Sequence, residues 1–225
     1  MGIFSLVKQE VDIVFERDPA AKSKAQVYFL YPGVRALINY RVAHWFDGKG
    51  FHFIADWISK KTRARTGIEI HPSAKIGKGV FIDHGMGVVI GETAEVGDYC
   101  TIYQGVTLGG TGKDKGKRHP TIGKNVTIGS GAKILGPFTV GDNSKIAANA
   151  VVLNEIPPNS TCVGVPAHIV KRDNVRVASA KPTIQPIADL DQIHIPDPVS
   201  MELCSLRVEM ERMKKKLEEM EQNGK

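Results

Sequence analysis

An aliphatic residue recurs at every sixth position from Ile70 onward, and this period limits the possible folds more than any other feature. Neither an α-helix nor a strand with alternating sides has a period of six. A coil of three short strands joined by tight corners has this period, because each strand then directs one aliphatic side chain inward. The sequence therefore predicts a parallel β-helix. The predicted inward residues fall into three frames: Ile70, Ile76, Ile82 and Val88; Ile90, Val96, Ile102 and Leu108; and Ile122, Ile128, Ile134, Val140, Ile146 and Val152.

Two further regularities support the coil. Glycine often follows the aliphatic residue, as a corner with positive φ or close backbone approach requires. A second, mostly small or apolar set stands four residues after the aliphatic positions and suits inward corner sites. Its members are Ala74, Val80, Met86, Ala94, Cys100, Val106, Val126, Ala132, Phe138, Ser144 and Ala150. Cys162 joins this set if the frame continues, so we interpret Cys100 and Cys162 as interior fillers rather than nucleophiles.

The repeats predict an α+β chain of four parts. Residues 1–66 show helical spacing broken by prolines, and we expect three or four helices that cap the open edge of the first coil. Residues 67–172 form the β-helix, from which the polar segment 109–121 leaves as a loop. Residues 173–198 form a proline-containing linker. Residues 199–222 repeat apolar side chains at intervals of three and four, which fits either an amphipathic helix docked on its own subunit or a short coiled coil.

Charge and cysteine content argue against several classes of protein. The formal net charge of +6 is spread over both ends and one loop, which disfavours a nucleic-acid-binding surface. The three cysteines are far apart and lack C-x-x-C spacing, so we expect a reducing cytoplasm, no disulfide framework and no metal. No segment approaches the roughly 18 apolar residues of a spanning helix, and no signal peptide is recognisable, so we expect no membrane association.

Two motifs give the chain a family likeness. They are IEIHPSAKIGKGVFIDHGMGVVIGETAEVGD at residues 68–98 and TLGGTGKDKGKRHPTIG at residues 107–123. With RDPAAKS at 17–23, YRVAHWF at 40–46, GAKILGPFTVG at 131–141 and GVPAHIV at 164–170, they make residues 15–172 resemble the serine acetyltransferases of the hexapeptide-repeat acyltransferase family. The resemblance implies a left-handed β-helix in a homotrimer or a dimer of trimers, with active sites between subunits. It also implies acetyl transfer from acetyl-CoA to the hydroxyl of L-serine, in cysteine biosynthesis.

The resemblance assigns the general base to His84, since imidazole is the side-chain group best suited to proton transfer near working pH and would take the serine proton. Glu69 matches the carboxylate that orients this ring, although the family commonly has Asp there. Without its context, His84 would be interpreted as a structural histidine beside a turn. The expected mechanism is direct transfer in a ternary complex, without an acyl-enzyme.

Further residues match the family's binding positions. Asp18 and Asp83 match positions that bind the serine amine, while Arg118 and His119 match those that meet its carboxylate and the developing negative charge. Asp18 also suits a helix N-cap before Pro19, and Arg118 also suits a solvated loop.

The resemblance also indicates where acetyl-CoA binds. It points to Gly110 and Thr111 at the start of the loop, and to Ser130, Lys145 and Ala148 on later coils. Small residues let the pantetheine arm approach backbone amides, and Lys145 would meet a phosphate as a point charge.

Two other functions remain open at this stage. One is an acetyltransferase of the same solenoid that acts on a sugar or another small hydroxyl or amine acceptor, and the other is a scaffold that recruits partners through its C-terminal helix. The resemblance also implies feedback inhibition by L-cysteine. Many members of the family insert a C-terminal isoleucine into cysteine synthase. This sequence ends in Asn223, Gly224 and Lys225, so we expect weak or absent binding of that partner.

Overall fold

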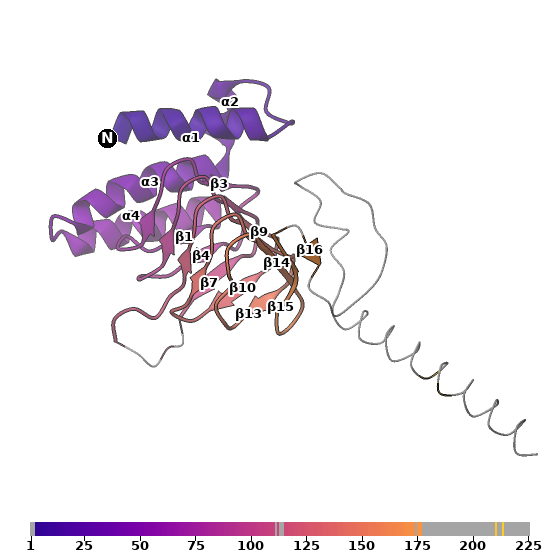
Figure 1. The fold of residues 1–225 in the computed structure, drawn as a ribbon. Coiled ribbons are helices and arrows are strands. Elements are labelled where there is room, and N and C mark those ends of the chain that lie inside the picture. Colours follow the sequence, from indigo (N-terminus) through magenta and orange to yellow (C-terminus); the bar gives the residue numbers. More distant parts are fainter. Residues whose placement is uncertain are drawn as a thin grey trace, which may run out of the picture.

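The computed structural model describes residues 3–110, 112, 115–173, 175–176, 210 and 213. Within these residues, helices come first and a coil of short strands follows (Figure 1). Thr111, most of the predicted linker, Cys204 and the chain end lie outside the described residues. The same holds for the predicted C-terminal helix, except that Met210 and Met213 are helical.

Four helices form the cap in the described part of the chain. They are α1 (Ile3–Arg17), α2 (Lys24–Leu30), α3 (Pro32–Asp47) and α4 (His52–Thr66). The Ser23 hydroxyl accepts the N–H group of Gln26 in the first turn of α2, Pro32 opens α3, and Gly67 ends α4 in the left-handed conformation. The predicted cap is confirmed, because α3 and α4 contact the first coil while α1 and α2 pack beside α3 (Figure 1). None of the described helices is both long and apolar enough to cross a bilayer.

Three sheets form the sides of the coil. Sheet A contains β1 (Glu69–Ile70), β4 (Val89–Ile90), β7 (Thr107–Gly109), β10 (Lys133–Leu135) and β13 (Val151–Val152). Sheet B contains β2 (Lys75–Ile76), β5 (Glu95–Val96), β8 (Thr121–Ile122) and β11 (Thr139–Val140). Sheet C contains β3 (Phe81–Ile82), β6 (Thr101–Ile102), β9 (Thr127–Ile128), β12 (Lys145–Ile146), β14 (Ser160–Val163), β15 (His168–Arg172) and β16 (Val175–Arg176). All pairings are parallel except those of β15, which runs antiparallel to β14 and β16.

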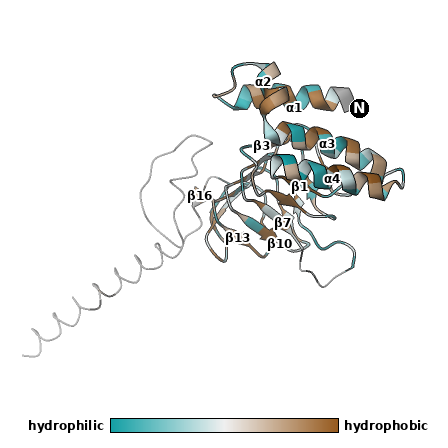
Figure 2. Cartoon of the chain, turned by 180° about the vertical axis from the view of Figure 1, so that it is seen from behind, coloured by the Kyte–Doolittle hydropathy of each residue, from teal (hydrophilic) through white to brown (hydrophobic). Residues whose placement is uncertain are grey.

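The strand register explains the six-residue period. It aligns the aliphatic residues into one inward column per sheet, and no member of a column is more than 8% exposed. The columns are Ile70, Ile90, Leu108, Ile134 and Val152; Ile76, Val96, Ile122 and Val140; and Ile82, Ile102, Ile128, Ile146 and Cys162. In Figure 2 the strands and the helices both carry hydrophobic and hydrophilic residues. The predicted parallel coil is confirmed, and it fits the left-handed β-helix implied by the resemblance.

One corner departs from the predicted frame. Met86 was expected to point inward but is 67% exposed, and Val88 fills the inward corner position before Ile90 instead of lying on a strand. The reason is that eight residues, rather than six, separate the inward residues of β3 and β4. The extra length forms an outward turn in which His84 has a φ of 54°. Gly85 is required there, because a Cβ atom would lie 2.4 Å from the Ile68 side chain.

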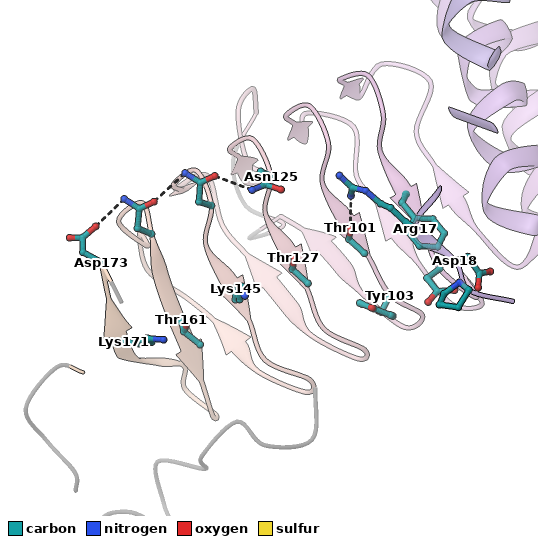
Figure 3. A pocket seen from close by; sticks show the side chains of 15 residues that line it. Arg17, Asp18, Thr101, Tyr103, Asn125, Thr127, Lys145, Thr161, Lys171 and Asp173 are labelled. Atoms are coloured by element: carbon teal, nitrogen blue, oxygen red, sulfur yellow. Dashed lines mark hydrogen bonds between the residues drawn. The ribbon is translucent and has the colours of Figure 1, made fainter. Parts of the chain in front are cut away.

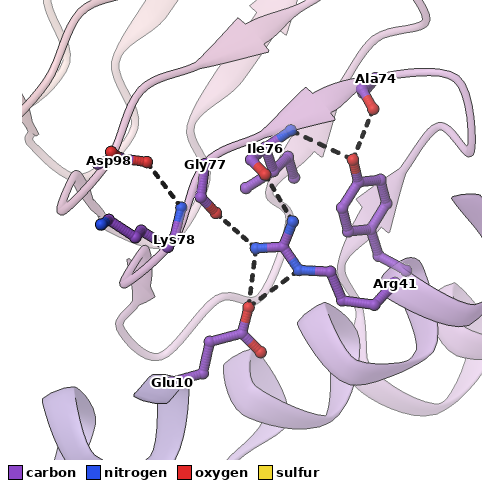
Figure 4. A network of polar contacts seen from close by, with 8 residues as sticks. Glu10, Arg41, Ala74, Ile76, Gly77, Lys78 and Asp98 are labelled. Atoms are coloured by element: carbon purple, nitrogen blue, oxygen red, sulfur yellow. Dashed lines mark hydrogen bonds and ion pairs between the residues drawn. The ribbon is translucent and has the colours of Figure 1, made fainter. Parts of the chain in front are cut away.

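A buried ion pair fastens the cap to the coil (Figure 4). The fully buried carboxylate of Glu10 in α1 accepts hydrogen bonds from Nε and Nη2 of Arg41 in α3, at 3.1 and 2.9 Å. The same guanidinium donates to the backbone carbonyls of Ile76 and Gly77 in the first coil. Since α1 leads directly into Asp18, this network also sets where Asp18 lies.

Candidate active site

A groove of about 810 Å³ runs along the outer face of sheet C (Figure 3). Its walls include one outward side chain from each of several successive strands, namely Thr101, Thr127, Lys145, Thr161 and Lys171. Arg17 and Asp18 lie at the end nearest the helical cap, and Asp83, which follows β3 of the first coil, also lines the groove. The groove therefore has an acidic end beside α1 and a lysine-bearing end at the last strands.

An amide ladder forms one rim of the groove. Asn125 donates to Asn143 at 3.1 Å, Asn143 donates to Asn159 at 3.1 Å, and Asn159 donates to Asp173 at 2.9 Å. All four residues have positive φ, which Asn and Asp tolerate better than other side chains. Because each rung binds the next, the ladder holds the corners of successive coils in line beside the groove.

The Asp18 carboxylate is held on two sides. Its Oδ1 accepts the N–H group of Ala20 at 2.8 Å, and its Oδ2 accepts the hydroxyl of Tyr31 at 2.7 Å. The hydrogen bond to Asp18 is the main cause that raises the pKa of Tyr31 to about 12. Asp18 is not a helix N-cap, because Ser23 caps α2, so the alternative left open by the sequence is wrong. Tyr31 was not foreseen, since it reaches Asp18 only through the fold.

Asp83 and His84 occupy the outward turn at the corner between sheets C and A. Burial raises the pKa of Asp83, with a smaller contribution from the charge of Asp18, while His84 acts in the opposite direction. The His84 ring is 75% exposed, and its Nε2 lies 4.0 Å from Oδ1 of Asp83. Because the negative charges of Asp18 and Asp83 repel each other, a cation bound between the two carboxylates is favoured. This end of the groove is thus suited to an ammonium group beside an accessible imidazole.

Ser130 and Ala148 lie on the same corner as His84 in later coils. The N–H group of Gly105 donates to Met86 at 2.9 Å, and the N–H group of Asn149 donates to Ser130 at 2.8 Å. These backbone contacts stack the corners along the coil axis. Lys145 lies on the adjacent groove wall. The structure therefore brings three of the predicted cofactor residues to the side of the coil that carries His84.

Glu69 has partners other than the expected one. Its Oε1 accepts from Lys60 at 3.1 Å and its Oε2 pairs with Arg63 at 2.9 Å, both from α4. No hydrogen bond or ion pair joins Glu69 to His84 within the described residues, although the backbone N–H of Glu69 donates to Val88 at 2.9 Å. The orienting role of Glu69 stays a prediction that requires its side chain to leave α4.

Arg118 and His119 lie at a different corner, between sheets A and B. The Thr93 hydroxyl accepts the N–H groups of Arg118 and His119 at 3.0 and 3.1 Å, and the Arg118 guanidinium pairs with Glu92. Arg118 is therefore anchored rather than fully solvated. Gly110 closes the base of the loop, because a Cβ atom there would lie 3.0 Å from Cγ of Arg118. Within one chain, sheet A lies between the corner that carries Arg118 and His119 and the corner that carries His84.

His119 is buried and neutral in this arrangement. Its Nδ1 accepts the N–H group of Thr93 at 3.2 Å, so the ring proton resides on Nε2. Burial above all, and then the charge of Arg118, lower the pKa of His119. Glu92 and Thr93 were not predicted as site residues. Their position as a polar pair within GETA, at a corner of the repeat, could have indicated that they contact the loop.

Cys100 and Cys162 are fully buried, as predicted for interior fillers, and burial raises their pKa values to about 11 and about 12. Because the thiolate is the reactive form, we expect a Cys204→Ser variant to show no fast-reacting thiol near neutral pH and two thiols after denaturation. Titration with an aromatic disulfide reagent measures this. Rapid labelling of the native variant with parallel loss of acetyl transfer would contradict the prediction.

No group of three or more His, Cys, Asp or Glu residues in the described segments is arranged to hold a metal ion.

Comparison with known proteins first defines the class. Residues 119–154 match the family model described as bacterial transferase hexapeptide (six repeats). A serine acetyltransferase of Staphylococcus xylosus is 50% identical over 206 residues, which cover 92% of this chain and 91% of that protein. The chain belongs to the serine acetyltransferase family of hexapeptide transferases.

Solved structures agree with this assignment. Serine acetyltransferase of Neisseria gonorrhoeae in complex with serine matches 75% of this chain with a TM-score of 0.73 and 39% identity. The Brucella abortus enzyme in complex with coenzyme A matches 75% with a TM-score of 0.73 and 43% identity. A serine acetyltransferase in complex with cysteine matches 76% with a TM-score of 0.74 and 41% identity. The matched region spans 69%, 68% and 66% of those three chains, respectively.

Proposed function

We propose that this chain transfers the acetyl group of acetyl-CoA to the side-chain hydroxyl of L-serine, giving O-acetyl-L-serine and CoA. The reaction serves cysteine biosynthesis, and we place it in the cytoplasm. The observation that carries the proposal is the acidic end of the groove. There, Asp18 and Asp83 line the groove, and Asp83 lies 4.0 Å from the exposed ring of His84, in a member of the serine acetyltransferase family.

In the proposed reaction His84 acts as the general base. Its unprotonated nitrogen takes the hydroxyl proton of serine while the serine oxygen attacks the thioester carbonyl, and the tetrahedral intermediate then expels the CoA thiolate. The imidazolium returns the proton to that thiolate, so the ring ends the cycle neutral. The outward turn supports this role because it leaves the ring of His84 accessible beside Asp83, which lines the groove.

The amino acid needs a clamp with charges of both signs. Asp18 and Asp83 are suited to its ammonium, and Arg118 and His119 to its carboxylate and to the oxyanion. Because these groups lie on different corners of one chain, we propose a homotrimer or a dimer of trimers in which Arg118 and His119 of one subunit face His84 of the next. L-Cysteine carries the same amine and carboxylate, so it would compete for this clamp as a feedback inhibitor; a related enzyme was solved in complex with cysteine.

Acetyl-CoA would bind along the same side of the coil. Ser130 and Ala148 are small corner residues that leave backbone amides within reach of the pantetheine arm, and Gly110 and Thr111 would contribute from the loop. Lys145 would meet a phosphate. The solved Brucella abortus relative in complex with coenzyme A supports acetyl-CoA as the co-substrate.

The function is tested by thiol release from acetyl-CoA with a panel of acceptors that includes L-serine, other hydroxyl amino acids and sugars. L-Serine should be the preferred acceptor, and mass spectrometry should show its O-acetyl product. Preference for a sugar would show that the chain is an acetyltransferase for the other class of acceptor. The absence of thiol release with every acceptor would favour a scaffold function.

Tyr31 offers a sharper test of the amine clamp. Replacing Tyr31 with Phe removes the 2.7 Å hydrogen bond that holds Asp18 but keeps the ring. Because a hydrogen bond to a charged group contributes about 1.5–3 kcal/mol and this one is partly exposed, we expect the KM for serine to rise about fivefold. The kcat and the KM for acetyl-CoA should change less than about twofold. Equal changes in both KM values would contradict a role confined to Asp18, and Tyr28→Phe on exposed α2 is the matched control.

A further inference from the structure

One row of corner residues connects the outward turn with the later coils. The row follows the corner between sheets C and A, and its members in four successive coils are Met86, Gln104, Ser130 and Ala148. Each member precedes a residue whose φ lies between 58° and 75°. The carbonyl groups of the first three members accept backbone N–H groups of the next coil at 2.9, 2.8 and 2.8 Å. The row is therefore a regular stack with a spacing of about 4.8 Å.

Gln104 brings an unused hydrogen-bond acceptor to this row. Its side-chain oxygen is buried and has no hydrogen-bond partner within the described part of the chain. Because burial of an acceptor without a donor is unfavourable, such an atom commonly indicates a function or a bound molecule. The backbone around it is fixed, since the carbonyl of Gln104 accepts the N–H group of Gly131 at 2.8 Å and the Lys133 ammonium donates to the carbonyl of Gly105. The acceptor is thus held in place and lacks a donor.

The position of Gln104 indicates which ligand could supply that donor. In the coil before it, the same corner carries the outward turn with His84, and in the coil after it the corner carries Ser130. Tyr103, which directly precedes Gln104, lines the groove. Acetyl-CoA with its thioester at His84 and its pantetheine arm at Ser130 would have to pass Gln104.

The first donor along the pantetheine arm falls at this coil. The amide nitrogen nearest the sulfur of coenzyme A is three bonds away from it, which is about 4 Å in an extended chain. Successive coils lie about 4.8 Å apart. With the sulfur level with the outward turn, this N–H group is therefore level with Gln104. The same N–H group is removed from water on binding, so it requires an acceptor as much as the Gln104 oxygen requires a donor.

We propose that the side-chain oxygen of Gln104 accepts a hydrogen bond from the amide N–H group of acetyl-CoA nearest the thioester. This inference rests on the proposed acetyl-CoA-dependent function and adds a residue that selects among thioesters. Gln104 binds the co-substrate and takes no part in proton transfer. A thioester that carries an N–H group at this place is thus preferred over one that carries none.

The experiment compares acetyl-CoA with an ester analogue, in which an ester oxygen replaces this one N–H group. For the unchanged full chain, the KM for the ester analogue should be about fivefold higher, because one hydrogen bond is lost and the Gln104 oxygen stays unpaired. Gln104→Met keeps the length of the side chain without the acceptor. It should raise the KM for acetyl-CoA about fivefold, bring the two KM values within about twofold of each other and leave kcat within about twofold. Gln104→Glu retains an acceptor oxygen and should preserve the preference for acetyl-CoA.

Gln9→Met is the matched control. The side-chain oxygen of Gln9 is also buried without a partner in the described segments, but Gln9 lies on α1 and outside the groove lining. This variant should keep the fivefold difference between the two KM values. The thermal midpoint of Gln104→Met should not fall, because the substitution removes an unpaired polar atom. The inference is overturned if Gln104→Met keeps the preference for acetyl-CoA, or if the unchanged chain shows none.

Calorimetry separates this contact from the proposed function. Binding of CoA and of its ester analogue is measured without an acceptor, in the unchanged chain and in Gln104→Met. A chain that prefers CoA through Gln104 but acetylates no serine would retain the contact and refute the proposed function. A chain that acetylates serine but binds both compounds equally would retain the function and overturn the contact.

Discussion

The His84→Asn variant is expected to lose acetyl transfer to serine by about a thousandfold in kcat, because proton transfer by a positioned base typically contributes two to four orders of magnitude. Asn is chosen because it accepts the positive φ of this position, which is 54°. The ring is 75% exposed, so we expect its removal to cost little stability. Thiol release at saturating serine and acetyl-CoA measures the effect.

Two controls make this result specific. The thermal midpoint of His84→Asn should match that of the unchanged chain, and calorimetry should show CoA binding within about twofold, since the variant alters neither the interior nor the groove walls. Met86→Leu, which changes the exposed neighbour in the same turn while keeping an apolar side chain, should retain most of its kcat. A His84→Asn protein with a tenth or more of the original kcat would refute the general-base assignment.

Of the substitutions considered, Arg41→Met is expected to lower the free energy of unfolding most, by about 3–5 kcal/mol. The substitution leaves the fully buried carboxylate of Glu10 without its cation and removes the donors to the carbonyls of Ile76 and Gly77. Burial already raises the pKa of Glu10, and Arg41 opposes that rise. Urea unfolding followed by circular dichroism measures the change.

The matched comparisons separate burial from charge. Removing both charges, in Glu10→Gln with Arg41→Met, should recover part of the loss, because no isolated charge then remains buried. Lys24→Met breaks the ion pair with Asp12, in which the side chains are 59% and 30% exposed, and should cost less than about 1 kcal/mol. An Arg41→Met loss as small as that of Lys24→Met would show that the buried network does not fasten the cap.

The sequence was informative wherever structure follows from a local pattern. The six-residue period placed Ile102, Ile128 and their equivalents inside, because one inward residue per strand is a property of each short segment. The same reasoning failed at Met86 and Val88. The two-residue slip was visible in the sequence, but which residue filled the corner depended on how the extra length turns outward at His84 and Gly85, both of which have positive φ. The strand that carries Lys171 was not foreseen as antiparallel, because it lies beyond the last full repeat.

By itself, the sequence determined the coil, the helical cap and the residue types that carry chemistry, because these follow from periodicity and from short motifs around His84 and Arg118. Only the tertiary structure decided the partners: Tyr31 on Asp18, Glu92 on Arg118, Lys60 and Arg63 on Glu69. The physical reason is that hydrogen bonds and ion pairs are made over a few ångströms, and side chains from separate elements come that close only after the interior of the coil has packed.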